Sequence, residues 1–190
     1  SWQSVLGCSR KLFDLAGVGV QDRLFFLMPF TGSSGPWIMY EGACSLCCGC
    51  GTAGSSEQAD HLLMASNFQP TVLVGKPSRL REFAVTAEDV GLNPSAMTVR
   101  NLILTGEAAS GPLREELERR WGACCFDRYG LTEAGSVAGE CSAHRGGLHI
   151  LEEEFLAEAI DPVTTQPAGD GELGELVLTN FGRTARPIIR

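Results

Sequence analysis

The sequence has few basic residues and no long apolar run. Its 15 Lys and Arg residues stand against 23 Asp and Glu residues, which gives a formal net charge of −8. Because contacts with phosphates need clustered Lys and Arg, this balance argues against a nucleic-acid partner. The longest apolar run, residues 24–30, is far shorter than the roughly 20 residues of a transmembrane helix. We therefore expect neither a nucleic-acid nor a membrane partner, and 190 residues suffice for one domain with a core.

Half of the eight cysteines crowd into one stretch, whereas in a small secreted disulfide scaffold they would be spread along the chain. Four lie in one short stretch, namely Cys44, Cys47, Cys48 and Cys50. A metal or iron–sulfur site is one interpretation of this stretch. We favour a buried strand, whose alternating side chains keep the thiols from converging on one ion. Free, buried thiols predict a reducing environment, so the expected location is the cytoplasm.

Apolar periodicity predicts alternating helices and strands along most of the chain. The expected helices cover residues 4–15, 57–67 and 77–85, with another beginning after Ser110. The expected strands cover residues 24–28, 71–74 and 99–104. Alternation of this kind indicates a parallel sheet flanked by helices.

The pattern changes in the last forty or so residues. Residues 155–160 and 175–179 both have the composition of strands, and the Pro-, Gly- and Asp-containing residues 161–174 between them are typical of turns. We therefore predict an α/β fold in two parts. An α/β sheet region covers residues 1–145, and a β-rich part over residues 146–190 forms a C-terminal β-hairpin appendage.

Residues 126–135 carry the clearest chemical signal. A strand leads into a glycine-containing turn that presents the ring of Tyr129, the hydroxyl of Thr132 and the carboxylate of Glu133. Open α/β sheets bind ligands at this carboxyl edge. A tyrosine ring can stack on a base, a threonine hydroxyl can reach a phosphate oxygen, and a glutamate can hold Mg²⁺. An ordinary turn with a surface glutamate is the alternative.

Residues 129–133 (Tyr-Gly-Leu-Thr-Glu) resemble the adenine- and phosphate-contacting signature of adenylate-forming enzymes, and residues 106–108 (Gly-Glu-Ala) resemble their adenine loop. Residues 147–152, 160–162 and 170–179 are similar to phenylacetate-CoA ligases and coenzyme F390 synthetase-like proteins. The resemblance implies that residues 1–190 are the central part of a large N-terminal AMP-binding domain. It also implies that the family's phosphate loop and C-terminal domain are missing.

The resemblance also implies a reaction, in which ATP activates a carboxylic acid to an acyl-adenylate and CoA then accepts the acyl group. The expected substrate is phenylacetate or another aryl acid. The expected partners are ATP, CoA and Mg²⁺. The chain alone is expected to be inactive. Thr132 and Glu133 take the catalytic roles, with Glu133 as the Mg²⁺ ligand. The implied nucleotide-binding residues are Gly106, Glu107, Ala108, Asp127, Tyr129, Gly130, Leu131 and Thr132.

The expected acid pocket lies between the Tyr129 turn and residues 30–37, with help from the loop at residues 75–78. Residues 31–35 look like a phosphate-binding loop but lack its lysine, and the resemblance implies that they fall where the family has its acyl-pocket helix. Two other functions stay open. One is a noncatalytic nucleotide-binding or interaction module, and the other is adenylation with transfer to a carrier-protein thiol or an amine. An exposed apolar face would favour a homodimer.

A second group of residues, near position 145, has the spacing of metal ligands. Cys141, His144 and His149 could hold a structural Zn²⁺, with Cys124, Cys125 or water as the fourth ligand. The alternative is a polar loop that contains a partly buried cysteine.

Overall fold

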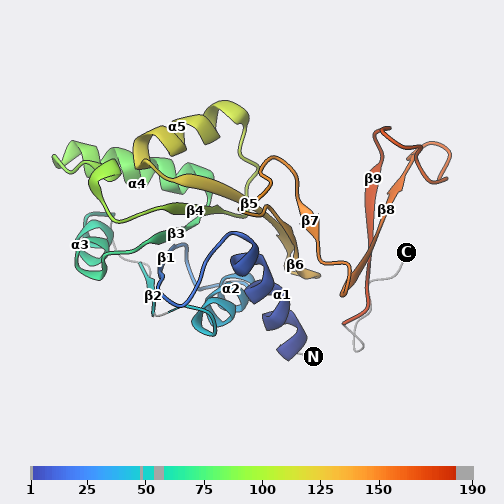
Figure 1. The fold of residues 1–190 in the computed structure, drawn as a ribbon, viewed down its shortest axis with the longest axis horizontal. Helices are drawn as coiled ribbons and strands as arrows, with labels where there is room; N and C mark the ends of the chain where they lie inside the picture. Colours follow the sequence, from blue (N-terminus) through green and yellow to red (C-terminus); the bar gives the residue numbers. More distant parts are fainter. Residues whose placement is uncertain (1, 48, 54–57, 183–190) are drawn as a thin grey trace.

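The computed structural model describes residues 2–47, 49–53 and 58–182 as a mixed α/β fold (Figure 1). In chain order the elements are α1 (Trp2–Leu15), β1 (Arg23–Leu27), α2 (Gly35–Cys44), β2 (Gly49–Thr52), α3 (Gln58–Phe68), β3 (Val72–Gly75), α4 (Pro77–Asp89), a 3₁₀ helix η1 (Pro94–Ala96), β4 (Asn101–Leu104), α5 (Gly111–Trp121), β5 (Cys124–Leu131), β6 (Gly135–Gly139), β7 (His149–Ile150), β8 (Phe155–Ile160) and β9 (Glu175–Asn180). None of the described helices is long and apolar enough to cross a bilayer.

The main sheet has the strand order β2-β1-β3-β4-β5-β6-β7. Strands β2, β1, β3, β4 and β5 run parallel to their neighbours, and β6 and β7 add antiparallel pairs at one side. Helices cover both faces, with α4 and α5 above the sheet and α1 and α2 below it in the view of Figure 1. The predicted parallel sheet flanked by helices is confirmed. The carboxyl ends of its parallel strands meet at one edge, where a ligand site is expected.

Two apolar clusters explain why the central strands are buried on both faces. On the side of α3, α4 and α5, Leu73 and Leu102 pack in one cluster with Trp121. On the side of α1 and α2, Val74 and Ile103 pack in the other with Phe13. Neighbouring residues of each strand thus point to opposite clusters. The continuous apolar runs in the sequence correspond to strands without a solvent-exposed face.

The cysteine-rich stretch differs from the predicted buried strand. Cys44 ends α2, Cys47 lies in the following turn, and Cys50 belongs to the short strand β2, whereas Cys48 lies outside the described residues. Pro36 in the first turn favours a helix start here. These thiols lie in a helix, a turn and a strand. The expectation that alternating side chains of one strand keep them apart therefore does not apply to them. The sulfur atoms of Cys47 and Cys50 lie 3.3 Å apart.

Close packing of α2 on α1 accounts for that helix. A Cβ atom on Gly42 would lie only 2.7 Å from the Cβ atom of Ser9, so the two helices approach as closely as they do because residue 42 has no side chain. The sequence periodicity of α2 alone did not predict this helix, since its apolar segment is short and is flanked by glycine and cysteine.

The predicted C-terminal hairpin is confirmed. Strands β8 and β9 pair antiparallel, from Phe155 opposite Asn180 to Ile160 opposite Glu175, and form a two-stranded sheet of their own. The hairpin extends away from the main sheet in Figure 1. Phe155 packs with Val137 in a small cluster that joins the base of the hairpin to β6.

Candidate functional site

A pocket of about 290 Å³ opens at the carboxyl edge of the sheet. Its wall is built from four places in the chain: the segment from Met28 through the first turns of α2, Lys76 after β3, the loop after β4, and the β5–β6 hairpin. The strand order brings these segments together, since parallel strands all end at this edge. The segments expected to form the acid pocket therefore contribute to one cavity.

Five of the predicted site residues line this pocket, namely Gly106, Tyr129, Gly130, Leu131 and Thr132. Gly106 has φ of +77°, which glycine adopts without strain. A Cβ atom on Gly130 would lie 2.6 Å from the carbonyl oxygen of Gly135, so the hairpin closes only because residue 130 is glycine. The strand register shifts between Tyr129 and Gly130, and such a bulge re-aims the side chains beside it.

Glu107 and Ala108 do not line the pocket. Glu107 accepts a hydrogen bond from the Ser78 backbone N–H, and its Oε1 atom lies 3.4 Å from Lys76 Nζ. Hydrogen bonds from Ser78, together with the Lys76 ammonium, hold the pKa of Glu107 below its usual value. Glu107 thus links the loop after β4 to the start of α4, and this link positions its neighbour Gly106 at the pocket.

Asp127 and Glu133 also lie outside the lining. Asp127 is half-buried, and its carboxylate accepts the N–H of Arg128, while burial raises its pKa. Glu133 is exposed in the β5–β6 turn, directly after Thr132. The Glu133 side chain is therefore exposed next to a lining residue, whereas Asp127 is half-buried within β5.

A buried ion pair supports β5 behind the pocket. The guanidinium of Arg114 donates two hydrogen bonds to Glu140, both 2.8 Å long, and Glu140 is 2% exposed. The backbone N–H groups of Asp127 and Gly146 donate to the same carboxylate at 2.8 and 2.6 Å. Burial alone would raise the pKa of Glu140, but these donors outweigh it and lower the pKa. Glu140 thus joins α5, β5 and the loop before β7.

The structure brings together only part of the predicted zinc site. Cys141 Sγ lies 3.1 Å from His149 Nε2 and accepts the backbone N–H of His144 at 3.1 Å. No group of three or more His, Cys, Asp or Glu side chains that could hold a metal ion occurs in the described part of the chain. The polar loop with a partly buried cysteine, the alternative interpretation, describes this arrangement.

Curated proteins similar to this chain share one activity by name. The chain is 34% identical over 163 residues to the phenylacetate-coenzyme A ligase of Pseudomonas putida, an alignment that covers 85% of this chain and 36% of the relative. It is 32% identical over 142 residues to the phenylacetate-coenzyme A ligase of Escherichia coli, covering 73% of this chain and 32% of the relative. The chain belongs to the phenylacetate-CoA ligase family. It spans about a third of the length of these relatives, and no family model matches it.

Solved structures show that this member of the phenylacetate-CoA ligase family has the fold of other CoA ligases. The whole chain aligns with 43% of a 2-hydroxyisobutyryl-CoA ligase solved with 2-HIB-AMP and CoA, with a TM-score of 0.92 and 21% identity. An anthranilate-CoA ligase solved with anthranoyl-AMP aligns over 93% of this chain and 35% of its own, with a TM-score of 0.69 and 18% identity.

Arg128 is a charged pocket residue of this phenylacetate-CoA ligase relative that sequence reasoning did not assign to the site. It is 7% exposed, and its Nη2 atom donates to Ser136 Oγ at 2.9 Å and to Ser9 Oγ at 3.1 Å. Its Cζ atom lies 4.3 Å from the centre of the Phe13 ring. Burial lowers its pKa to about 9. The sequence held one sign of this burial: Arg128 comes two residues after Phe126, and both lie in a strand whose apolar residues are buried.

Proposed function

We propose that this chain is part of an AMP-forming acid–thiol ligase, which activates a carboxylic acid with ATP and passes the acyl group to CoA. The observation that carries the proposal is one pocket lined by Gly106, Tyr129 and Thr132, the residues in which the chain resembles adenylate-forming enzymes. Membership of the phenylacetate-CoA ligase family supports the same reaction. Phenylacetate or another aryl acid is the proposed substrate.

The first step joins the acid to the nucleotide. A carboxylate oxygen attacks the α-phosphorus of ATP, the bond from that phosphorus to the bridging oxygen breaks, and pyrophosphate leaves. In our proposal the Tyr129 ring stacks on adenine, Gly106 lies against the base, and the Thr132 hydroxyl donates to an α-phosphate oxygen. These residues position the reactants and stabilise developing charge instead of reacting themselves.

The second step transfers the acyl group. The sulfur of CoA attacks the acyl carbon, the thiol proton is released, and the bond from that carbon to the AMP oxygen breaks. For Mg²⁺, the residue that fits is Glu133, because its exposed carboxylate follows Thr132 and carboxylate oxygens suit this ion. When bound there, Mg²⁺ would neutralise the negative charge of the phosphates. A chain with a net charge of −8 supplies little of the positive charge that this needs.

Three further points are proposed from the sequence alone. The chain would be part of an AMP-binding domain, with its sheet region at residues 1–145 and its β-rich part at residues 146–190. The protein would act in the cytoplasm, where its cysteines stay reduced. A homodimer is the proposed assembly, and the chain by itself would be inactive.

The test is acid-dependent exchange between ATP and pyrophosphate in the full-length protein. Phenylacetate should support exchange, and Glu133→Gln should slow it by roughly 100-fold or more, since it removes a charged group that acts on the phosphates. Glu115→Gln is the matched control, because Glu115 is an exposed carboxylate on α5, away from the pocket.

Three results would redirect the proposal. Unchanged exchange in Glu133→Gln would exclude the metal role of Glu133. Nucleotide binding without exchange for any acid offered would favour the noncatalytic module. AMP release from the preformed adenylate with a carrier-protein thiol or an amine, but not with CoA, would identify a different acceptor.

A further inference from the structure

Arg128 is a buried cation that contacts no carboxylate among the described residues. Its Nη2 atom donates to neutral hydroxyl groups, and its Nη1 atom is buried and has no hydrogen-bond partner. Burying a charge is unfavourable unless an opposite charge and hydrogen bonds compensate for it. The Phe13 ring under the guanidinium compensates only in part. The arrangement therefore lacks an anion.

Arg114 shows how this chain satisfies an arginine that is structural. Both of its terminal nitrogens donate to the carboxylate of Glu140, which supplies the opposite charge within the fold. Arg128 has no such partner in the described part of the chain, and unlike Arg114 it lines the pocket. The difference indicates that the missing anion comes from a ligand.

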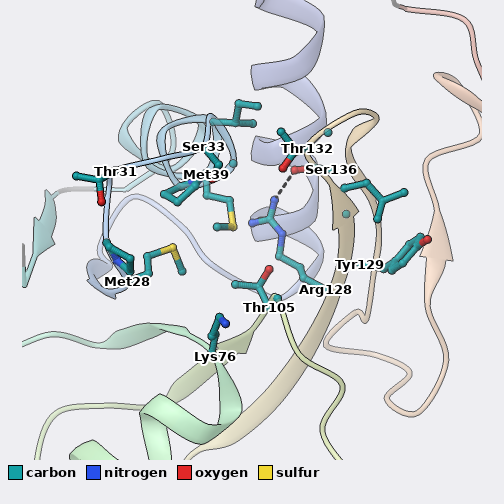
Figure 2. Close-up of a pocket in the computed structure, with 18 residues that line it drawn as sticks. Met28, Thr31, Ser33, Met39, Lys76, Thr105, Arg128, Tyr129, Thr132 and Ser136 are labelled. Carbon is teal, nitrogen blue, oxygen red and sulfur yellow. Dashed lines mark hydrogen bonds between the residues drawn. The ribbon is translucent and has the colours of Figure 1, made fainter. Parts of the chain in front are cut away.

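The lining of the pocket has an exposed part and a buried part. Thr132 and Gly106 are exposed parts of the lining, whereas Ile38, Met39 and Arg128 are buried parts of it. Figure 2 shows the Arg128 guanidinium between Ser136 and the sulfur of Met39, with its unpaired side toward Met39. A methionine side chain is flexible, so a change of its rotamer would open Nη1 to a bound molecule.

We propose that the acid substrate carries a second anionic group, remote from the carboxylate that is activated, and that Arg128 binds this group. The inference rests on the proposed function, in which ATP occupies the exposed part with Thr132 and Gly106. The activated carboxylate then meets the α-phosphate there, and the rest of the acid extends toward the buried part. Apolar contacts come from Ile38 and Met39, while Ser136, which accepts from Arg128, has its own hydroxyl proton left to donate. An aryl dicarboxylate fits this chemistry.

The experiment compares matched acids in the full-length protein. The probes are phenylacetates that carry a carboxylate at each ring position, and the corresponding methyl-substituted phenylacetates. The ratio of kcat/KM for each pair in ATP–pyrophosphate exchange measures the preference for the second anion. We expect at least one carboxylated acid to be preferred, and Arg128→Met to lower that preference at least about 30-fold, as expected for removing one partner of a buried ion pair.

Two further variants keep the test interpretable. Arg128→Lys retains the charge, so it should keep part of the preference, and it replaces Arg128→Met if that variant does not fold. Arg100→Met is the matched control, since Arg100 pairs with Asp22 and lies outside the pocket lining. Its ratio should equal that of the unchanged protein. The ratio is used because a general loss of protein stability lowers the measured kcat/KM for both acids of a pair alike.

Calorimetric binding of each carboxylated phenylacetate in the absence of ATP separates the two proposals. Turnover of the methylated acids with no preference for any carboxylated one overturns the Arg128 site and leaves the ligase reaction standing. An unchanged preference in Arg128→Met overturns it as well. Diacid binding that disappears in Arg128→Met, with no exchange for any acid, supports the anion site and contradicts the proposed reaction.

Discussion

Glu140→Gln tests the ion pair that supports the pocket strand. The substitution keeps the shape of the side chain but removes the charge opposite Arg114 and places an amide NH₂ against donors. Because Glu140 is 2% exposed and accepts four hydrogen bonds, the loss should be that of a broken buried pair, about 3–5 kcal/mol. At about 2–4 °C per kcal/mol for a chain of this size, Tm should fall by roughly 6–20 °C.

The assay is thermal and urea unfolding followed by circular dichroism, at several pH values. The lowered folded-state pKa of Glu140 means that its contribution is complete above the unfolded pKa, near 4.5, and is lost as pH falls through the folded value. The difference between the unchanged protein and Glu140→Gln should therefore shrink below about pH 4.5.

Glu82→Gln is the control for this prediction. Glu82 pairs with Arg79 on the surface of α4 at 2.6 Å, and exposed pairs of this kind contribute about 0–1 kcal/mol. The reasoning is refuted if Glu140→Gln is no more destabilising than Glu82→Gln at neutral pH. It is also refuted if the effect of Glu140→Gln grows as the pH falls.

Two further predictions concern the β5–β6 hairpin. Tyr129→Ala should raise the Kd for ATP about 5- to 100-fold in equilibrium binding, because stacking of a base on an aromatic ring contributes about 1–3 kcal/mol, whereas Tyr129→Phe keeps the ring and should bind as before. An equal loss in both variants would contradict stacking. Gly130→Ala should lower the free energy of unfolding by about 1–3 kcal/mol, because the new Cβ atom would lie 2.6 Å from a backbone oxygen of Gly135. Gly111→Ala, in open space on α5, should be neutral or slightly stabilising, and an equal effect of the two alanines would exclude the clash.

The predicted elements that proved correct are those with a strong local pattern. Strands β1, β3 and β4 are apolar runs because both sheet faces are covered, and α5 has Leu117 and Trp121 at helical spacing, both buried. The prediction failed around Cys44–Cys50, where a short apolar segment fits a helix or a strand equally well. Packing of Gly42 against Ser9 on α1 decided in favour of the helix, and this contact is remote in sequence.

The candidate site divides in the same way. Residues 129–133 and 106–108 were identifiable from the sequence, because the order of residue types in a short motif is a local property. That Gly106 and residues 129–132 meet in one pocket with Lys76 and α2 depends on parallel strands that end at the same edge. Of the nine predicted site residues, Glu107, Ala108, Asp127 and Glu133 lie outside the lining, because the position of each loop and strand around the pocket is a tertiary property that a local motif does not contain.

The sequence by itself determined the family, the alternation of helices and strands, and the motif that carries the proposed nucleotide contacts. It could not determine the environment of Arg128, because an arginine in a strand points to water or to the interior depending on what covers that face. In this chain α1 covers it, with Ser9 and Phe13 against the guanidinium. Only the tertiary structure made this arginine a buried charge in the lining of the pocket, since burial results from packing between segments more than a hundred residues apart.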